Sequence, residues 1–295
     1  MTITGSTQLL GVIGDPIAHS LSPVMHNAAL AELGVDAVYV AFPVAAEGLE
    51  AAIAGFAAIG VHGFSVTIPH KQAIVPLLTE LTVEAQAVGA VNTVWRTERG
   101  WAGTNTDVAG FVAPLKARPG GQQDWAGKTA LVLGNGGAAR AVVAGCGQLG
   151  FAVVQVVGRS IQKLADFKQS WVDSPIELTL TTHSWADLPT LLPEADLIVN
   201  TTPIGMHTTA DQTPLTADQL DRVQKTAVVY DLIYTPRPTR LLTLATQRGL
   251  GTIDGLEMLV QQGAVALEMW LQRPVPVATM RQALVEWLAT KTVRT

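Results

Sequence analysis

The sequence predicts an α/β protein with two domains, and three observations support this fold class. The chain has 295 residues, which is more than one hydrophobic core usually accommodates. Short apolar runs, such as residues 9–13 and 38–42, alternate with helical patterns, as in α/β folds. Near the middle of the chain, the run 128–133 leads directly into glycines and then into an alanine-rich helical pattern that ends near Gly150. This strand, tight turn and helix are typical of a Rossmann-type domain.

The composition narrows the classes of function. Apolar residues make up 48% of the chain and charged residues 15%, which is typical of a well-buried α/β protein. The net charge of −5 offers no broad electrostatic attraction for nucleic acid or an anionic membrane, so we expect small-molecule partners. The single cysteine, Cys146, excludes an internal disulfide and a cysteine-based metal cluster, and it favours a reducing cytoplasm. No run of residues indicates a signal peptide or a membrane helix.

The first predicted strand, residues 9–13, is followed by a helix with clear ends. Ser22 is expected to be its N-cap, Pro23 suits the first helical position, and Gly34 suits the residue just beyond the helix. Capping alone explains Ser22, but it does not explain Ser20. Two hydroxyls at a strand-to-helix junction could also hold a small carboxylate, so both interpretations of this pair stay open.

Lys71 is the first Lys or Arg of the chain, and it follows the third predicted strand, residues 61–68. The carboxyl ends of strands are where the ligand sites of α/β proteins gather. The segment after Lys71, residues 72–78, is predicted to be helical. Lys71 is therefore a candidate for proton transfer, and the alternative is an ordinary surface lysine.

Asp107 is the candidate partner of Lys71. It follows a predicted hairpin, residues 89–95 and 100–103, and it precedes an apolar stretch. Alone, Asp107 would be interpreted as a helix N-cap. Placed near Lys71, its carboxylate would hold and orient the ammonium group. Further along, residues 119–124 have the composition of a polar linker and mark the first domain boundary.

The glycine-rich turn has the spacing G-x-G-x-x-A. Gly134 allows the sharp turn, Gly136 lets the backbone approach a pyrophosphate, and Ala139 keeps the helix close to the strand. Residues 151–157 are predicted to be a second buried parallel strand, so the motif lies inside a βαβ unit. This context favours a dinucleotide site over the alternative, which is a glycine-rich turn without a ligand.

The end of that second strand indicates which dinucleotide is expected. An NAD site places Asp or Glu there to bind the ribose hydroxyls, whereas this chain has Gly158 and Arg159. Arg159 offers a planar fork for a 2′-phosphate, and Lys163 adds a positive charge one helical turn later. The predicted cofactor is therefore NADP. The alternative for Arg159 is a solvated loop arginine.

Two more strands are predicted in the second half, at residues 195–199 and 227–231. The first ends in a polar loop, residues 200–206, which again falls at the carboxyl end of a strand. Near the C-terminus, a long helix contains Gln261 and Gln262. These two side chains either lie on the helix surface or face a polar ligand.

Seven motifs, in order along nearly the whole chain, resemble those of the shikimate dehydrogenase family. They are Ser20-Leu-Ser22-Pro23, Ser65-Val-Thr67-Ile-Pro-His-Lys71, Gly89-Ala-Val-Asn92-Thr93, Asn105-Thr-Asp107, Gly134-Asn-Gly-Gly-Ala-Ala-Arg140, Asn200-Thr-Thr-Pro-Ile-Gly-Met206 and Asp254-Gly-Leu-Glu-Met-Leu-Val-Gln-Gln262. The resemblance implies an oxidoreductase that reversibly reduces 3-dehydroshikimate to shikimate with NADPH, in chorismate and aromatic amino acid biosynthesis. It also implies a discontinuous substrate-binding domain, residues 1–113 plus 257–295, with a Rossmann-type NADP-binding domain, residues 114–256, inserted between its parts.

The resemblance also implies a role for each matching residue. Lys71 would transfer the proton, paired with Asp107. The substrate would be bound by Ser20, Ser22, Thr67, Asn92, Tyr234 and Gln262. The cofactor would be bound by Gly134, Asn135, Gly136, Gly137, Ala138, Arg159, Ser160, Lys163, Leu232 and Gly255. No metal ion is implied, and no His, Cys and Asp residues have the spacing of metal ligands.

Two positions depart from the family pattern, since Ser65 and Gly158 stand where the family usually has Asn. Two alternative functions are considered. The first is a quinate/shikimate dehydrogenase that uses NAD, against which Arg159 argues. The second is a non-catalytic NADP-binding regulator on the same fold, against which the combination of Lys71 with Asp107 argues. A homodimer is considered as the assembly.

Overall fold

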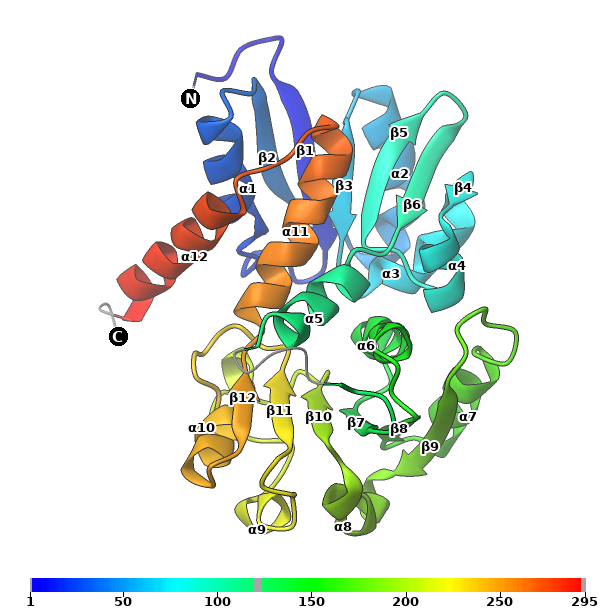
Figure 1. Cartoon of the computed structure of the whole chain (residues 1–295). Coiled ribbons are helices and arrows are strands. Elements are labelled where there is room, and N and C mark those ends of the chain that lie inside the picture. Colours follow the sequence, from blue (N-terminus) through cyan, green and yellow to red (C-terminus); the bar gives the residue numbers. More distant parts are fainter. Residues whose placement is uncertain (1, 119–123, 293–295) are drawn as a thin grey trace. The chain divides into compact units, whose positions relative to one another are not determined.

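The structure is a computed structural model that describes residues 2–118 and 124–292, and it confirms an α/β protein with two compact units (Figure 1). Unit 1 comprises Met1–Gly110 and Leu259–Thr295, and unit 2 comprises Phe111–Met258. The chain passes from one unit to the other within the helices α5 (Asp107–Lys116) and α11 (Leu256–Leu271). The linker expected at residues 119–124 lies outside the described residues except for its last residue.

Unit 1 contains a mixed six-stranded sheet with the order β2-β1-β3-β5-β6-β4. Parallel pairing joins β1 to β2 and to β3, because a helix connects these strands in sequence, whereas β5 and β6 form the predicted antiparallel hairpin. The bounds are β1 (Gln8–Gly14), β2 (Ala37–Pro43), β3 (Gly63–Val66), β4 (Glu80–Leu81), β5 (Thr93–Thr97) and β6 (Gly100–Thr104). The third strand is thus shorter than the predicted 61–68, and the two-residue β4 had no apolar run to predict it.

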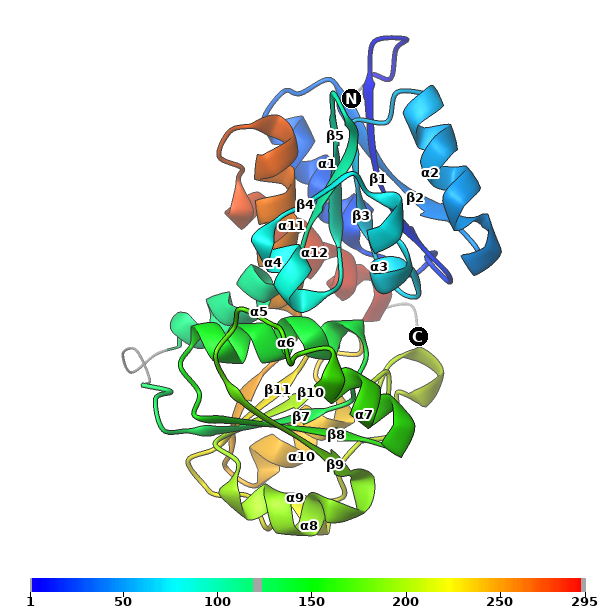
Figure 2. The ribbon, with the colours of Figure 1, turned by 90° about the vertical axis from the view of Figure 1, so that its right-hand side faces the viewer.

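Helices cover both faces of this sheet (Figure 2). On one face lie α1 (Ser22–Glu32), α11 and α12 (Val277–Thr292), and on the other lies α2 (Leu49–Ala58). The core under α2 contains Phe56, Phe64 and Trp101, whose successive rings meet at 5.2 Å in edge-to-face geometry. The helix α1 ends as predicted, with Gly34 in the left-handed region at φ 63°.

The prediction of a single helix over residues 72–78 is wrong. The structure has a short helix α3 (His70–Ala73) and then a separate 3-10 turn, Val75–Leu77. Pro76 explains the break, because it has no N–H to bond the carbonyl of Gln72 in a continuous α-helix. After this turn comes α4 (Val83–Val88), which Gly89 ends at φ 64°.

Unit 2 contains a parallel sheet with the order β12-β11-β10-β7-β8-β9. Read from its other edge and in chain order within the unit, this is the 3-2-1-4-5-6 order of Rossmann folds. The bounds are β7 (Thr129–Leu133), β8 (Val153–Gly158), β9 (Thr179–Ser184), β10 (Leu197–Asn200), β11 (Val228–Asp231) and β12 (Gly251–Ile253). The strand β9 was not predicted, because its threonines, His183 and Ser184 form no apolar run.

Helices again cover both faces of the unit 2 sheet (Figure 2). On one face lie α6 (Gly137–Gln148) and α7 (Ile161–Gln169), and on the other lie α8 (Leu188–Leu191), α9 (Ala217–Leu220) and α10 (Arg240–Gln247). The strand order reverses between β7 and β10, so the crevice at their carboxyl ends is the expected ligand position. Within residues 2–118 and 124–292, no helix is long and apolar enough to cross a membrane.

Candidate active site

Lys71 and Asp107 form an ion pair in unit 1. Lys71 is in α3, just after β3, and Asp107 is the first residue of α5, so two loops at one edge of the sheet bring them together. The side chains are 16% and 7% exposed, and the Lys71 ammonium donates to Oδ2 of Asp107. An ordinary surface lysine would be far more exposed. The pair combines a mobile proton with a carboxylate that orients it, as general acid–base chemistry requires.

Asn92 fixes the other oxygen of the Asp107 carboxylate. Its amide Nδ2 donates to Oδ1 of Asp107 at 2.8 Å and to Oγ1 of Thr106 at 3.0 Å, and its Oδ1 accepts from the Thr106 N–H at 2.7 Å. Asn92 is only 2% exposed. Both oxygens of the carboxylate therefore have partners, and the rotamer of Asp107 is determined before any ligand arrives. Thr106 was not singled out in the sequence, where it is only the middle residue of the Asn-Thr-Asp motif.

Gln262 reaches the same cluster from α11, which is distant in sequence. Its Oε1 lies 3.4 Å from Nδ2 of Asn92, and its own Nε2 donates to the Leu259 carbonyl at 2.8 Å. Gln262, one of the two glutamines singled out in the sequence, thus bonds to this cluster. Thr67 is half-buried at the end of β3.

The His70 ring bonds to a backbone carbonyl outside the cluster that contains Lys71 and Asp107. The ring nitrogen Nε2 lies 2.7 Å from the Val44 carbonyl, and the residue is only 1% exposed. A ring nitrogen that donates to a buried carbonyl is occupied by the protein itself. His70 therefore serves the loop between β2 and α2, although it is the sequence neighbour of Lys71.

The expectation that Ser22 caps α1 is wrong. The helix begins at Ser22 itself, the preceding Leu21 is the N-cap residue, and no side chain caps it. The Oγ of Ser20 instead accepts from the Ser22 N–H at 3.3 Å. Pro23 within the first turn leaves one backbone donor fewer to satisfy. The hydroxyl of Ser22 is thus not used by the helix backbone.

The glycine-rich turn in unit 2 lies at the point where the strand order reverses. Gly134 follows β7 with φ 106°, and a Cβ there would lie 2.6 Å from Oγ1 of Thr201, at the end of the neighbouring β10. A Cβ built on Gly136 has open space around it, with no atom within 4 Å. Gly136 is also the N-cap residue of α6, where no side chain bonds the first N–H groups. This turn therefore fits a pyrophosphate: it has free donors, a positive helix end and room.

Arg159 and Lys163 are exposed next to this turn, at the end of β8 and in the first turn of α7. The guanidinium of Arg159 has no hydrogen bond or ion pair with any described residue. Ser160 is the N-cap of α7 and accepts from the Lys163 N–H at 3.4 Å. At Gly158, an added Cβ would lie 2.9 Å from Leu164, so the usual Asn of the family would require Leu164 to move.

Asp231, at the end of β11, holds two loops of unit 2 together. Its carboxylate accepts from Nδ2 of Asn200 at 3.0 Å, from the Thr239 hydroxyl at 2.7 Å and from the Ile233 N–H at 3.2 Å. Asp231 and Asn200 are fully buried. The motif Asn-Thr-Thr-Pro gave a signal for Asn200, but nothing in the sequence linked it to Asp231.

Leu232 and Gly255, both expected to bind the cofactor, are neighbours. The Gly255 N–H donates to the Ile233 carbonyl at 3.2 Å, and a Cβ on Gly255 would lie 2.1 Å from the Leu232 carbonyl oxygen. Only glycine allows this close approach of two backbone segments. The ion pair between Arg237 and Asp254, at 2.5 Å, closes the same two loops.

The buried Asp231 predicts a pH dependence of stability. Burial raises its pKa from 3.8 to about 6, against the opposing hydrogen bonds from Thr239, Ile233 and Asn200. Because the folded-state pKa exceeds the unfolded-state value, the contribution to stability is complete below pH 3.8 and is lost as the pH rises to about 6. We expect the stability advantage of wild type over Asp231→Asn to shrink by about 3 kcal/mol across that window. Urea unfolding of both proteins at a series of pH values measures this, and a constant difference would contradict it.

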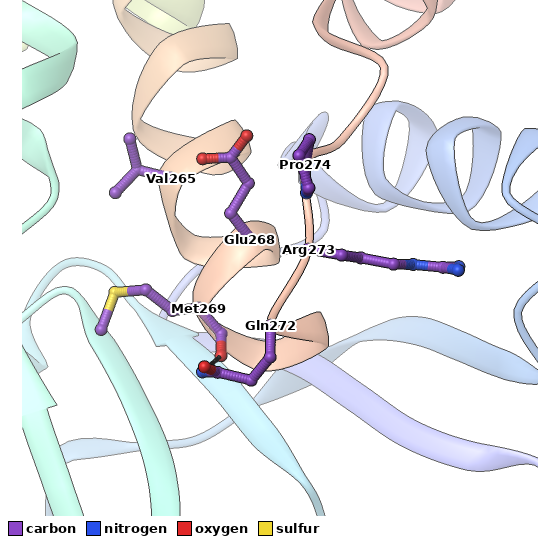
Figure 3. A pocket seen from close by; sticks show the side chains of 6 residues that line it. All are labelled: Val265, Glu268, Met269, Gln272, Arg273 and Pro274. Atoms are coloured by element: carbon purple, nitrogen blue, oxygen red, sulfur yellow. Dashed lines mark hydrogen bonds between the residues drawn. The ribbon is translucent and has the colours of Figure 1, made fainter.

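A surface hollow of about 430 Å³ lies elsewhere in unit 1, at the C-terminal end of α11 (Figure 3). Its polar side chains bond nearby backbone groups: Glu268 accepts from the Val275 N–H at 3.3 Å, Arg273 donates to the Leu33 carbonyl at 3.3 Å, and Gln272 donates to the Met269 carbonyl at 2.5 Å. The hollow shares no residue with the Lys71 cluster. In the part of the chain that the structure describes, no group of three or more His, Cys, Asp or Glu side chains could hold a metal ion.

Comparisons with known proteins give a consistent result. Residues 12–94 match the family "Shikimate dehydrogenase substrate binding domain", and residues 255–285 match "Shikimate 5'-dehydrogenase C-terminal domain". The chain is 59% identical over 290 residues to a shikimate dehydrogenase (NADP(+)) of a Nostoc species, covering 98% of this chain and 100% of that one.

Two solved structures extend this similarity to the fold. One is a shikimate 5-dehydrogenase from Listeria monocytogenes in complex with shikimate and NAD, with a TM-score of 0.85 and 34% identity over 96% of this chain and 98% of that chain. The other is a shikimate dehydrogenase in complex with NADP+, with a TM-score of 0.85 and 35% identity over 97% and 98%.

Proposed function

The chain belongs to the shikimate dehydrogenase family, and from this premise we propose that it catalyses the reversible NADPH-dependent reduction of 3-dehydroshikimate to shikimate. The observation that carries the proposal is the shielded Lys71–Asp107 pair, held in place by Asn92. A regulator that only binds a dinucleotide has no need of this pair. The fit of the Gly134–Gly136 turn to a pyrophosphate supports the cofactor.

Lys71 is the proton donor for reduction and the proton acceptor for oxidation. As the ketone becomes an alcohol, its oxygen gains negative charge, and the Lys71 ammonium gives that oxygen a proton. Asp107 keeps the ammonium in one place, because its other oxygen is bonded to Asn92 at 2.8 Å. Thr67, Asn92 and Gln262 read the ring hydroxyls. NADPH supplies the hydride when it is bound.

The remaining residues bind the two ends of the ligands. Ser20 and Ser22 hold the substrate carboxylate, and Tyr234 is proposed as a further substrate-binding residue. Gly134, Asn135, Gly136, Gly137 and Ala138 hold the pyrophosphate. The adenosine phosphate end is held by Arg159, Ser160 and Lys163, and the nicotinamide end is lined by Leu232 and Gly255. Apart from Tyr234, this division follows the proposed domains, 1–113 plus 257–295 for the substrate and 114–256 for NADP.

The test is an absorbance assay at about 340 nm, the band of reduced nicotinamide, with shikimate and quinate each paired with NADP and NAD. We expect turnover of shikimate with NADP. Turnover of quinate with NAD as the preferred pair would replace the proposal by the quinate/shikimate alternative. Binding of NADP without any turnover would favour the regulator.

Alanine substitutions of Ser20 and Ser22 are expected to have different effects. Ser22→Ala should raise KM for shikimate without a loss of stability, because no cap is lost. Ser20→Ala should raise KM and also cost about 1 kcal/mol, because its Oγ accepts from the Ser22 N–H. Steady-state kinetics and urea unfolding of both variants measure the two effects. If neither variant changed KM, the serines would have a purely structural role.

The proposed location is the cytoplasm, which the single cysteine supports, since Cys146 is fully buried. The proposed partners are the substrate and NADP. A homodimer is the proposed assembly, and sedimentation of the pure protein at several concentrations tests it.

A further inference from the structure

Thr93 is a fully buried neighbour of Asn92, and it is not one of the proposed substrate or proton-transfer residues. It is the first residue of β5 and is 0% exposed. Its hydroxyl donates to Oδ1 of Asn92 at 3.1 Å and lies 3.1 Å from the hydroxyl oxygen of Thr106. Because a fully buried side chain cannot reach a substrate, any influence of Thr93 on catalysis passes through these two neighbours.

The side chains of Asn92, Thr93 and Thr106 form a closed ring of hydrogen bonds. Nδ2 of Asn92 donates to Oγ1 of Thr106 at 3.0 Å, and the Thr93 hydroxyl donates to Oδ1 of Asn92. A hydroxyl has a single hydrogen, so Thr106 is the donor in the remaining contact, from its hydroxyl to Oγ1 of Thr93. Hydrogen bonds linked in such a cycle strengthen one another. The ring connects β5 to the loop that precedes α5.

The ring determines where the second amide hydrogen of Asn92 points. The nitrogen Nδ2 carries two hydrogens, and one of them belongs to the ring. The other is directed to Oδ1 of Asp107 at 2.8 Å, which is nearer than Oε1 of Gln262 at 3.4 Å and carries charge.

Thr93 also restricts rotation of the Asn92 amide. The last torsion of an asparagine side chain is soft, because its preferred range is broad. Oδ1 of Asn92 accepts from the Thr106 N–H at 2.7 Å and from the Thr93 hydroxyl, and two donors near the amide plane fix that plane. The Thr106 hydroxyl lies 3.2 Å from the same oxygen, but donating there would open the ring. The Thr93 hydroxyl is therefore the donor that keeps the ring closed.

We propose that Thr93 is a positioning residue for the proton transfer. By closing the ring, its hydroxyl directs the Asn92 amide to the carboxylate of Asp107. That carboxylate in turn orients the Lys71 ammonium. Thr93 acts through Asn92 and touches neither the substrate nor the reacting atoms. This inference rests on the proposed function, in which the Lys71–Asp107 pair carries the proton.

Two substitutions at Thr93 separate the hydroxyl from the methyl group. Thr93→Val keeps the shape but removes the hydroxyl, so kcat for shikimate oxidation should fall about three- to tenfold, the usual worth of one neutral hydrogen bond. Thr93→Ser keeps the hydroxyl and should retain kcat within about twofold, although the lost methyl group lowers the thermal midpoint by about 2–4 °C. A role in packing alone predicts the opposite order, with the Ser variant more impaired. KM for NADP should stay near that of wild type in both.

The matched control is Thr104→Val, the same substitution at the residue that pairs with Thr93 between β5 and β6. The Thr104 hydroxyl bonds to Oγ1 of Thr82 at 2.8 Å and is not a member of the ring. Its loss should leave kcat unchanged. A double variant tests the route: Thr93→Val combined with Asn92→Ala should lower kcat no further than Asn92→Ala alone, since the ring acts through Asn92.

Normal kcat in a folded Thr93→Val protein would overturn the proposal, and so would an equal loss in Thr93→Ser or in Thr104→Val. Multiplied effects of Thr93→Val and Asn92→Ala would overturn it as well. Should Thr93→Val not fold, Thr106→Val opens the same ring: reduced kcat supports the proposal, and unchanged kcat overturns it. A lack of shikimate turnover by wild type would instead refute the proposed function.

Discussion

Replacing Lys71 by Met should lower kcat for shikimate oxidation by about 10²–10⁴-fold, the usual cost of a lost acid–base group. Met has a similar length and apolar stem but cannot carry a proton. Binding of NADP should be preserved, because the proposed cofactor residues all lie in unit 2 and Lys71 lies in unit 1. Steady-state kinetics and a fluorescence titration with NADPH measure the two quantities.

The matched control is Lys128→Met, which also breaks a Lys–Asp ion pair, with Asp196 at 3.2 Å. That lysine is 43% exposed, against 16% for Lys71, and it lies at the start of β7, so kcat should not change. Near-normal kcat in Lys71→Met together with inactive His70→Ala would transfer the proton donor to His70.

Asp107→Asn should lower kcat as well, because the amide loses the charge that orients the Lys71 ammonium. The Lys71→Met/Asp107→Asn double variant should lose much less than the product of the two single losses, since the pair acts as one unit. Multiplied losses would show that Asp107 acts independently of Lys71.

Replacing Arg159 by Ala should weaken NADP binding by about 1.5–3 kcal/mol, roughly 10- to 150-fold, and should leave NAD binding nearly unchanged. The reason is that the exposed guanidinium, which has no partner among the described residues, can form two charge-assisted bonds to the 2′-phosphate. NAD has a hydroxyl at that position, so Arg159 contributes little to the binding of NAD. Isothermal titration with each cofactor measures the difference.

The control for a general effect of positive charge is Lys168→Ala, which removes an exposed cation from the other end of α7. It should affect the two cofactors equally and weakly, as a distant screened charge does. An equal loss for both cofactors in Arg159→Ala would refute the assignment of Arg159 to the 2′-phosphate.

The amino-acid sequence was sufficient to predict those parts of the protein whose signals are local. Apolar runs predicted the central strands of both sheets. The G-x-G-x-x-A spacing predicted the turn at Gly134, because this turn has a positive φ that glycine adopts readily. The ordered motifs predicted the family. Local signals failed where a residue's neighbours override them: Pro76 broke a helix that the pattern favoured, and Ser20 rather than Ser22 bonds the backbone at the start of α1.

Contacts between side chains that are distant in sequence became visible only in the folded structure. Lys71, Asn92, Asp107 and Gln262 come from four segments, and their cluster exists because the sheet order of unit 1 and the return of α11 bring those segments to one place. The same holds for Asp231 with Asn200, and for Tyr39 with Ser65. Hydrogen bonds extend about 3 Å and depend on direction, whereas sequence spacing carries no information on the distance between residues on different strands. The candidate catalytic and binding residues could therefore be predicted from the sequence, whereas the residues that they hydrogen-bond could not.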